Sequence, residues 1–159
     1  IFSPLVLITL CVYLPAILIS GKSLYHDRSF LLMFNMLLIG VMAIILFSIS
    51  VTSGATRNKT GLLILFLLSA VTVVINGFAL SAVIFRISEW GMTPNRLSVL
   101  GGNMLILINL LFVTYRLFGM LRNRYGIEDV EISISKFIPV YWIWAIVVSF
   151  IFPIVFGFK

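Results

Sequence analysis

The sequence predicts an all-α protein, a polytopic transmembrane helical bundle of about five spans in a single domain over residues 1–159. Two features of composition predict this class. Hydrophobic residues make up 62% of the chain and charged residues 10%, against about 45–50% and about 25% in soluble domains. The mean hydropathy is +1.21. The third observation is that the apolar residues fall into long runs, and a run of 18 or more indicates a membrane-spanning helix.

The first predicted helix covers approximately 4–20. Ser3 is suited to cap it, Pro4 fits the first helical position, and Gly21 is suited to end it. Pro15 is expected to kink this helix, because its ring removes one backbone hydrogen bond.

Four more apolar runs follow, separated by links that contain Gly, Pro, Asn or basic residues, which end helices. The predicted helices cover approximately 30–51, 61–85, 94–117 and 137–156. The last two are separated by MLRNRYGIEDVEISISK, which is the one sizeable polar segment. In it Val130, Ile132 and Ile134 alternate with polar residues, a pattern typical of extended chain. We therefore predict a loop there.

The stretch RISEWGMTPNR joins the third and fourth predicted helices as a tight hairpin. Thr93 is suited to cap the fourth helix and Pro94 to be its first residue, while Gly91 supplies the turn. Trp90 is suited to anchor at the level of the lipid headgroups.

The charges of this hairpin predict a clamp. Glu89 lies near the carboxyl end of one helix and Arg96 in the first turn of the next, so each opposes the dipole of its own helix. An ion pair between them, joined by Arg86, relieves both. Contact with lipid headgroups is an alternative role for these side chains. Catalysis is disfavoured, because a single carboxylate without a partner base offers little acid–base chemistry.

Two asparagines lie at equal depth on either side of the hairpin. Asn76 and Asn103 each lie about 15 Å from the turn, near the middle of a bilayer. Each has a glycine beside it, so close helix packing with amide hydrogen bonds is one interpretation. The other is a polar path lined by these residues together with Asn109 and Asn35.

No catalytic, cofactor or metal site is predicted. The predicted spans contain no acidic residue, which argues against proton-coupled transport and aspartyl intramembrane proteolysis. His26, the one histidine, stands beside Asp27 in a link, and Cys11, the one cysteine, lies in an apolar run. The basic residues are spread over the links and form no patch, so we expect lipid and no nucleic acid as partner.

The segment FRISEWGMTPNRLSVLGGNMLILINLLFVTYRLF and the ending FIFPIVFGFK resemble the C-terminal part of uncharacterised bacterial multi-spanning proteins, the domain-of-unknown-function family 4153. That family joins two spans by an aromatic-Gly-[Ile/Leu/Met]-Thr-x-x-Arg hairpin. The matching residues are Trp90, Gly91, Met92, Thr93 and Arg96. The resemblance implies a multi-pass protein of the bacterial inner membrane and no particular activity. It also implies a longer protein, in keeping with a first residue that is not Met.

Three functional hypotheses follow. The first is a non-enzymatic scaffold or partner-binding membrane module, packed against other subunits or against helices that precede Ile1. The second is a transport or permeation unit for a lipid or other amphiphile, with Pro15 as a hinge. The third is an enzyme whose catalytic residues lie before Ile1.

The basic residues of the link around 116–136 favour a cytoplasmic position for that link.

Overall fold

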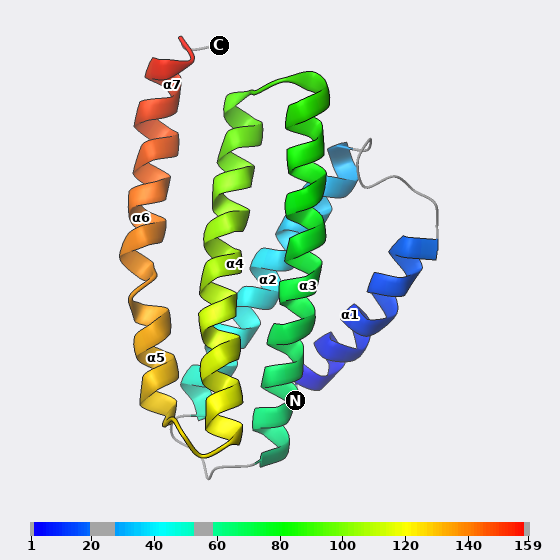
Figure 1. The fold of residues 1–159 in the computed structure, drawn as a ribbon, viewed down its shortest axis with the longest axis vertical. Coiled ribbons are helices and arrows are strands. Elements are labelled where there is room, and N and C mark those ends of the chain that lie inside the picture. The colour runs from blue at the N-terminus through cyan, green and yellow to red at the C-terminus, as the bar shows by residue number, and fades with distance from the viewer. Residues whose placement is uncertain (1, 20–27, 53–58, 158–159) are drawn as a thin grey trace.

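The computed structural model describes residues 2–19, 28–52 and 59–157. Within these ranges the chain is helical apart from short turns and has no strand, so the predicted all-α class is confirmed. The elements in chain order are α1 (Phe2–Ile19), α2 (Arg28–Thr52), α3 (Lys59–Trp90), α4 (Pro94–Leu121), α5 (Ile127–Ser135), α6 (Ile138–Ile146), the π-helix η1 (Val147–Ile151) and α7 (Phe152–Val155), as shown in Figure 1.

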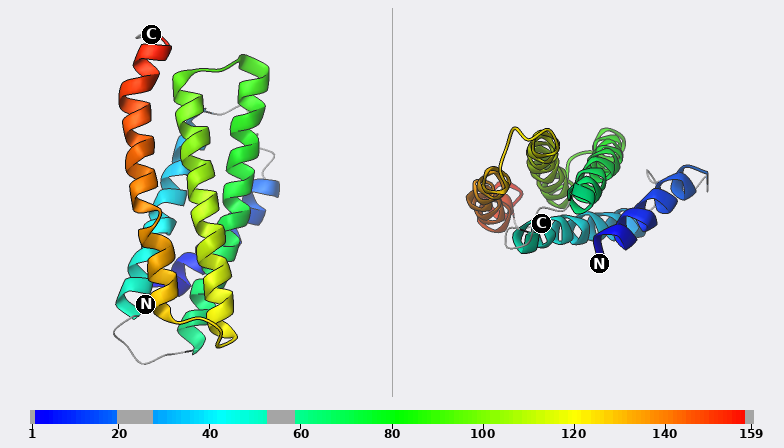
Figure 2. Two further views of the ribbon diagram at one scale, coloured as in Figure 1. Left: turned by 60° about the vertical axis from the view of Figure 1, so that its left-hand side comes forward. Right: turned by 90° about the horizontal axis from the view of Figure 1, so that it is seen from below.

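An antiparallel hairpin of α3 and α4 forms the centre of the bundle. The run from α5 to α7 lies along α4, whereas α1 packs against α3. Helix α2 crosses obliquely behind the hairpin and also reaches α5 (Figure 2). The turn between α3 and α4 and the helix α7 lie at the same end of the molecule, and the turn between α4 and α5 lies at the other.

Three helical runs of the described chain are long and apolar enough to cross a membrane: Lys59–Trp90, Pro94–Leu121 and Ile127–Val155. The apolar parts described for α1 and α2 are shorter, Ser3–Tyr13 and Asn35–Ile49. In the most apolar stretch of α3, 44% of the residues are buried, against 6% in the Ile127–Val155 run. Helix α3 is therefore the central helix, and the last run is peripheral.

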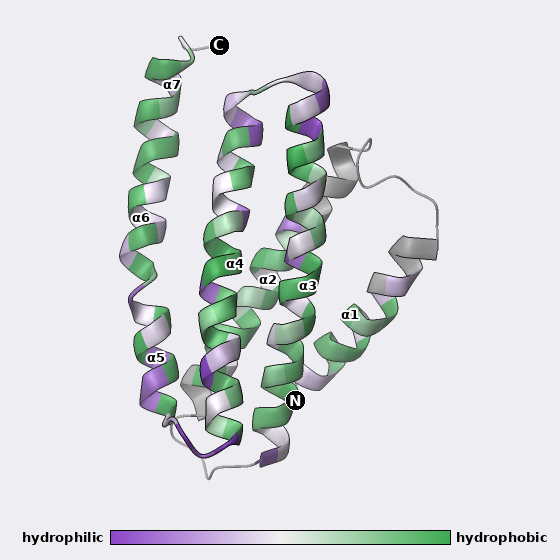
Figure 3. Ribbon diagram, in the orientation of Figure 1, coloured by the Kyte–Doolittle hydropathy of each residue, from purple (hydrophilic) through white to green (hydrophobic). Residues whose placement is uncertain are grey.

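The core lies where α2, α3 and α4 meet. Its most buried side chains are aliphatic: Leu38, Ile45, Leu68, Ile75, Leu110, Val113 and Leu117. Apolar residues also cover the outward faces of the helices, while hydrophilic residues gather near the helix ends and turns (Figure 3). A helix that is apolar on all sides is typical of a membrane span. The distribution therefore fits a lipid environment.

Backbone conformation ends the two central helices sharply. Gly91 follows α3 with φ +77°, a left-handed conformation that costs glycine little. Helix α4 ends in a Schellman motif, in which Arg124 N donates to Gly119 O at 2.8 Å and Asn123 N to Met120 O at 3.1 Å. Asn123 has the left-handed φ of +58° that this motif requires. Both turns are short, so α3, α4 and α5 must pack as neighbours.

The loop predicted over the polar segment is wrong for residues 127–135, which form α5. The same residues that alternate like a strand also fit a helical face, because Val130 is fully buried and Ile134, four residues on, is partly buried against the core. Asp129 secures the helix start by accepting a hydrogen bond of 2.8 Å from Gly126 N. Burial of one face and this cap outweigh the weak extended pattern.

The central helices are also longer than predicted. Helix α3 continues to Trp90, beyond the predicted end at residue 85, and α4 continues to Leu121, beyond residue 117. Hydropathy marks where apolar residues stop, whereas a helix continues until a residue such as Gly91 breaks the backbone pattern. Pro15 lies inside α1. Gly21, expected to end that helix, lies outside the described residues.

Candidate functional site

Three of the four predicted asparagines meet in a chain of amide hydrogen bonds. Asn76 Nδ2 on α3 donates to the backbone carbonyl of Asn103 on α4, at 3.1 Å. Asn103 Nδ2 in turn donates to Asn35 Oδ1 on α2, at 2.8 Å. Asn76 is fully buried and Asn103 is 4% exposed. The chain joins three helices through one largely buried position, and its first acceptor is a backbone carbonyl.

The polar face of α3 explains how Asn76 comes to be buried. Ser69, Thr72 and Asn76 share one helical face by their spacing, and all three are buried. The two hydroxyls are satisfied within α3, because Ser69 donates to Phe66 O and Thr72 to Leu68 O. Only Asn76 reaches across to α4. Its Oδ1 is buried and has no hydrogen-bond partner among the described residues.

The fourth asparagine, Asn109, contacts a different helix. Its Nδ2 donates to the hydroxyl of Tyr141 on α6, at 3.0 Å, and its Oδ1 is buried without a partner in the described part of the chain. It lies six positions after Asn103, which places the two on different faces of α4. The structure therefore does not line up all four asparagines along one path.

At the hairpin, the structure places the predicted cap residues as the sequence suggested. Thr93 is the N-cap of α4 and its hydroxyl accepts from Arg96 N at 3.3 Å. Pro94 is the first residue of the helix. The turn from Trp90 to Pro94 is thereby held tightly on its α4 side.

The predicted Glu89–Arg96 ion pair does not form. Within the described residues the one ion pair found joins Arg116 and Asp129. Arg96 Nη1 donates instead to the carbonyls of Trp90, at 2.8 Å, and Gly91, at 2.7 Å. These carbonyls carry the negative end of the α3 dipole and are held in place by the backbone. They are therefore better placed to bind the guanidinium than the exposed carboxylate of Glu89. The clamp joins Arg96 to the backbone, without Glu89.

Trp90 brings both cations of the hairpin together. The guanidinium carbon of Arg86 lies 5.2 Å from the centre of a Trp90 ring, and that of Arg96 lies 5.7 Å away. Both distances are within the range of cation–π attraction. Arg86 Nε is buried and has no hydrogen-bond partner in the described ranges. The predicted joining of Arg86 to the clamp therefore occurs through the indole.

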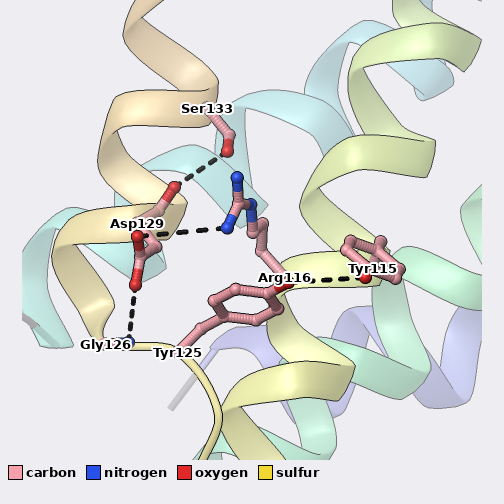
Figure 4. Close-up of polar contacts among 6 residues, drawn as sticks. All are labelled: Tyr115, Arg116, Tyr125, Gly126, Asp129 and Ser133. Atoms are coloured by element: carbon pink, nitrogen blue, oxygen red, sulfur yellow. Dashed lines mark hydrogen bonds and ion pairs between the residues drawn. The ribbon is translucent and has the colours of Figure 1, made fainter.

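A second polar cluster, which the sequence analysis missed, lies at the opposite end of the bundle (Figure 4). Arg116 on α4 stacks on Tyr125, with its guanidinium carbon 4.4 Å from the ring centre. Its Nη1 also lies 3.9 Å from Asp129 Oδ1 on α5. Ser133 donates to the backbone carbonyl of Asp129 at 2.8 Å. The cluster ties the turn between α4 and α5 to both helices.

Tyr125 fits this cluster because Gly119 leaves space for it. A Cβ added at Gly119 would overlap the ring of Tyr125. The Tyr125 hydroxyl lies 3.4 Å from that of Tyr115. This contact with Tyr115 is the largest cause that raises the pKa of Tyr125 above that of an ordinary tyrosine, although Arg116 acts in the opposite direction. One sequence signal pointed here: Gly126 followed three residues later by Asp129 is typical of a helix start.

The Gly-Gly-Asn step on α4 is a contact site for α6. A Cβ added at Gly101 would overlap the indole of Trp144, and a Cβ added at the neighbouring Gly102 would lie 3.8 Å from Nε1 of the same ring. Trp144 therefore lies directly on the backbone of α4. Small residues allow such close approach between membrane helices.

A hollow of about 410 Å³ opens between the start of α4 and the last turns of the chain. Its lining is Pro94, Asn95, Ser98, Val148, Phe152, Pro153 and Phe156. The π-helical turn η1 borders it, with Phe152 N bonded to Val147 O five residues back. The hollow is mostly apolar, and its polar groups come from Asn95 and Ser98 on α4. It does not include the buried asparagines.

Among the described residues, no three His, Cys, Asp or Glu side chains gather in a way that could hold a metal ion. Cys11 is exposed on α1. His26 and Asp27 lie outside the described residues. No family model, curated protein or solved structure matches the chain.

Proposed function

We propose that the chain is a non-enzymatic, multi-pass membrane module that acts as a scaffold or binds partner subunits. The observation that supports this most is the largely buried amide chain Asn76–Asn103–Asn35, which holds three helices together. Buried amide contacts between membrane helices contribute about 0.6–2 kcal/mol each. They favour a rigid bundle over one that opens to pass a substrate.

The outward surface supports a lipid or protein environment around this bundle. Large apolar side chains of the last helical run are strongly exposed, among them Trp142, Ile143, Phe150 and Ile154. Such a surface is stable when lipid or another apolar helix covers it. We infer that the lipid bilayer is the main partner, and that helices preceding Ile1 or other subunits pack on part of this face.

The resemblance of the hairpin to family 4153 leads us to propose the bacterial inner membrane as the location. Five spans, formed by α1, α2, α3, α4 and the run from α5 to α7, remain our interpretation of the bundle. Membrane insertion can be checked directly by alkaline carbonate extraction of membranes that contain the protein. We expect the chain in the pellet. Release into the supernatant would contradict the proposal.

A permeation unit for a lipid or other amphiphile is the second candidate. The observation that favours it is the pair of buried oxygens, Asn76 Oδ1 and Asn109 Oδ1, for which the described residues offer no donor. Buried acceptors are usually satisfied, and water that reaches mid-bilayer is one way to satisfy them. The two candidates therefore differ in whether water reaches these side chains.

Thiol labelling in membranes separates the two candidates. Single cysteines at Asn76, Asn103 and Asn109, in a Cys11→Ala background, are probed from each side with a small membrane-impermeant reagent. Ser88→Cys is the exposed control on α3. Ala79→Cys is the buried control, since Ala79 is fully buried and lies less than one helical turn from Asn76 without carrying an amide.

For the scaffold we expect labelling at Ser88 and none at the three asparagine positions or at Ala79. Labelling of the Asn76 or Asn103 position from one side, with Ala79 protected, would show water at mid-bilayer and favour permeation. Labelling at Ala79 as well would show that the bundle itself is open, which contradicts the dry interior on which the scaffold proposal depends.

A further inference from the structure

Arg86 carries a positive charge that has no carboxylate partner among the described residues. Its Nε is buried and has no hydrogen-bond partner among the described residues, although its guanidinium lies 5.2 Å from a Trp90 ring. A cation–π contact neutralises no charge and accepts no hydrogen bond along the plane of the guanidinium. Burying part of a charged group without an acceptor is costly. Nε itself is out of reach of an external group, but Arg86 as a whole is only partly buried, so an anion that approaches the rest of the guanidinium can balance its charge.

The surroundings of Arg86 strengthen this conclusion, because positive charge outweighs negative charge there. Arg96 approaches the same indole to 5.7 Å. Its Nη1 is held by two backbone carbonyls, which are neutral groups and leave its charge in place. Glu89, the nearby carboxylate, forms no ion pair within the described residues. Two guanidinium groups thus flank one tryptophan without a carboxylate partner.

The position of the cluster identifies the kind of anion. Trp90 ends α3, and tryptophan prefers the level of the lipid headgroups in membrane proteins. Arg86 lies one helical turn, about 6 Å, before this end, a distance that its long side chain spans to reach the headgroup layer. Phosphate oxygens are the abundant anionic acceptors at this level, and the fork of an arginine matches them well.

We propose that Arg86 binds the phosphate of an anionic phospholipid beside Trp90, with Arg96 supplying the second positive charge. This inference rests on the proposed membrane location. It assigns different roles to the two arginines of the hairpin. Arg96 holds the turn through the carbonyls of Trp90 and Gly91, and Arg86 is the lipid ligand.

Lipid titration by native mass spectrometry tests the proposal on the detergent-solubilised chain. Phosphatidylglycerol and phosphatidylcholine are compared on the wild type and on the Arg86→Gln and Arg86→Lys variants. The matched control is Arg122→Gln. Arg122 also lies over an aromatic ring, 4.4 Å from the centre of Phe118, but at the opposite end of α4. This control measures the effect of losing one positive charge elsewhere.

We expect the wild type to prefer phosphatidylglycerol and Arg86→Gln to bind it about tenfold more weakly, the usual effect of losing a charge-assisted hydrogen bond. Arg86→Lys, which keeps the charge and loses the fork, is expected to fall between the two, and Arg122→Gln to match the wild type. If Arg86→Gln misfolds, as judged by its helical circular dichroism, the comparison of Arg86→Lys with Arg122→Gln decides.

Equal binding by the Arg86 and Arg122 variants would overturn the proposal, as would a wild type without preference for the anionic lipid. Competition by millimolar inorganic phosphate separates the two sources of the same group. Displacement of the lipid from the wild type would identify a free-phosphate site and reject the lipid assignment. These outcomes do not depend on the thiol labelling above, so failure of the lipid site and failure of the dry scaffold can be told apart.

Discussion

The side-chain amide of Asn76 on α3 donates a hydrogen bond to the backbone carbonyl of Asn103 on α4, at 3.1 Å. The acceptor already belongs to the hydrogen-bond ladder of its own helix, and a carbonyl oxygen has a second lone pair for such a bond. Because the acceptor is backbone, a side-chain change at Asn103 does not remove it. The contact therefore fixes the register of the hairpin through one side chain only.

Replacing Asn76 with alanine should destabilise the bundle. The lost interhelical bond is expected to lower the free energy of unfolding by about 0.6–2 kcal/mol, measured by denaturation of the detergent-solubilised protein with sodium dodecyl sulfate. Asn95→Ala is the control, because Asn95 is exposed at the start of α4. It should change stability by less than about 0.5 kcal/mol. Equal effects of the two changes would show that the Asn76 contact contributes nothing.

A methyl group at Gly101 should separate α6 from α4, because its Cβ would overlap the ring of Trp144. Overpacking of this kind costs about 1–3 kcal/mol. Gly77→Ala is the matched control on α3, since a Cβ there meets nothing within 4 Å. Alanine at that position is expected to be neutral or to stabilise the helix by up to about 1 kcal/mol. If the Trp144 contact is as described, thermal unfolding gives a lower midpoint for Gly101→Ala and an unchanged or higher midpoint for Gly77→Ala.

Neutralising Arg96 should destabilise the turn between α3 and α4, whereas neutralising Glu89 should not. Arg96→Gln removes two charge-assisted hydrogen bonds to the carbonyls of Trp90 and Gly91. We expect faster amide hydrogen exchange across the turn and a loss of stability of about 1 kcal/mol, at the low end for charged donors because the site is exposed. Glu89→Gln should leave both quantities unchanged. A similar loss of stability in Glu89→Gln would instead support the Glu89–Arg96 ion pair predicted from the sequence.

The pKa of Tyr125 should fall when Tyr115 is replaced by phenylalanine. The Tyr115 hydroxyl is the largest cause of the raised pKa of Tyr125, so its removal leaves the lowering effect of Arg116 less opposed. A raised pKa stabilises the fold while the phenol is protonated, and this contribution is lost as the pH rises through the raised value. Absorbance titration of the phenolate, with Tyr125→Phe identifying the signal, measures the shift. An unchanged titration of Tyr115→Phe would contradict this.

The sequence was sufficient to predict the class and the outline of the helices, because long apolar runs have few other structures available to them. It also placed Thr93 and Pro94 correctly, since capping is decided within a few residues. It failed for α5, where nine residues fit both an extended and a helical pattern, and burial of Val130 together with the Asp129 cap favours the helix.

The partners of the polar residues could not be predicted from residues close to them in sequence. Asn109 finds Tyr141 across 32 positions of the chain, and Arg116 finds Tyr125 and Asp129 only because α5 turns back along α4. The Glu89–Arg96 prediction considered side-chain charges and helix dipoles separately. It overlooked that the carbonyls at the end of a helix are themselves acceptors, already positioned for a neighbouring cation.

The π-helical turn at Val147–Ile151 contains one residue more than a regular helix would have at this place. A turn closed by hydrogen bonds five residues apart holds one residue more than an α-helical turn between the same ends. It is equivalent to the insertion of one residue, equal to one codon, into a helix that continues on both sides. Removal of one of these five residues is therefore expected to leave a regular α-helical turn, while the residues after it keep their orientation. Phe152 and Phe156, which follow the turn, would then still line the hollow beside Ser98.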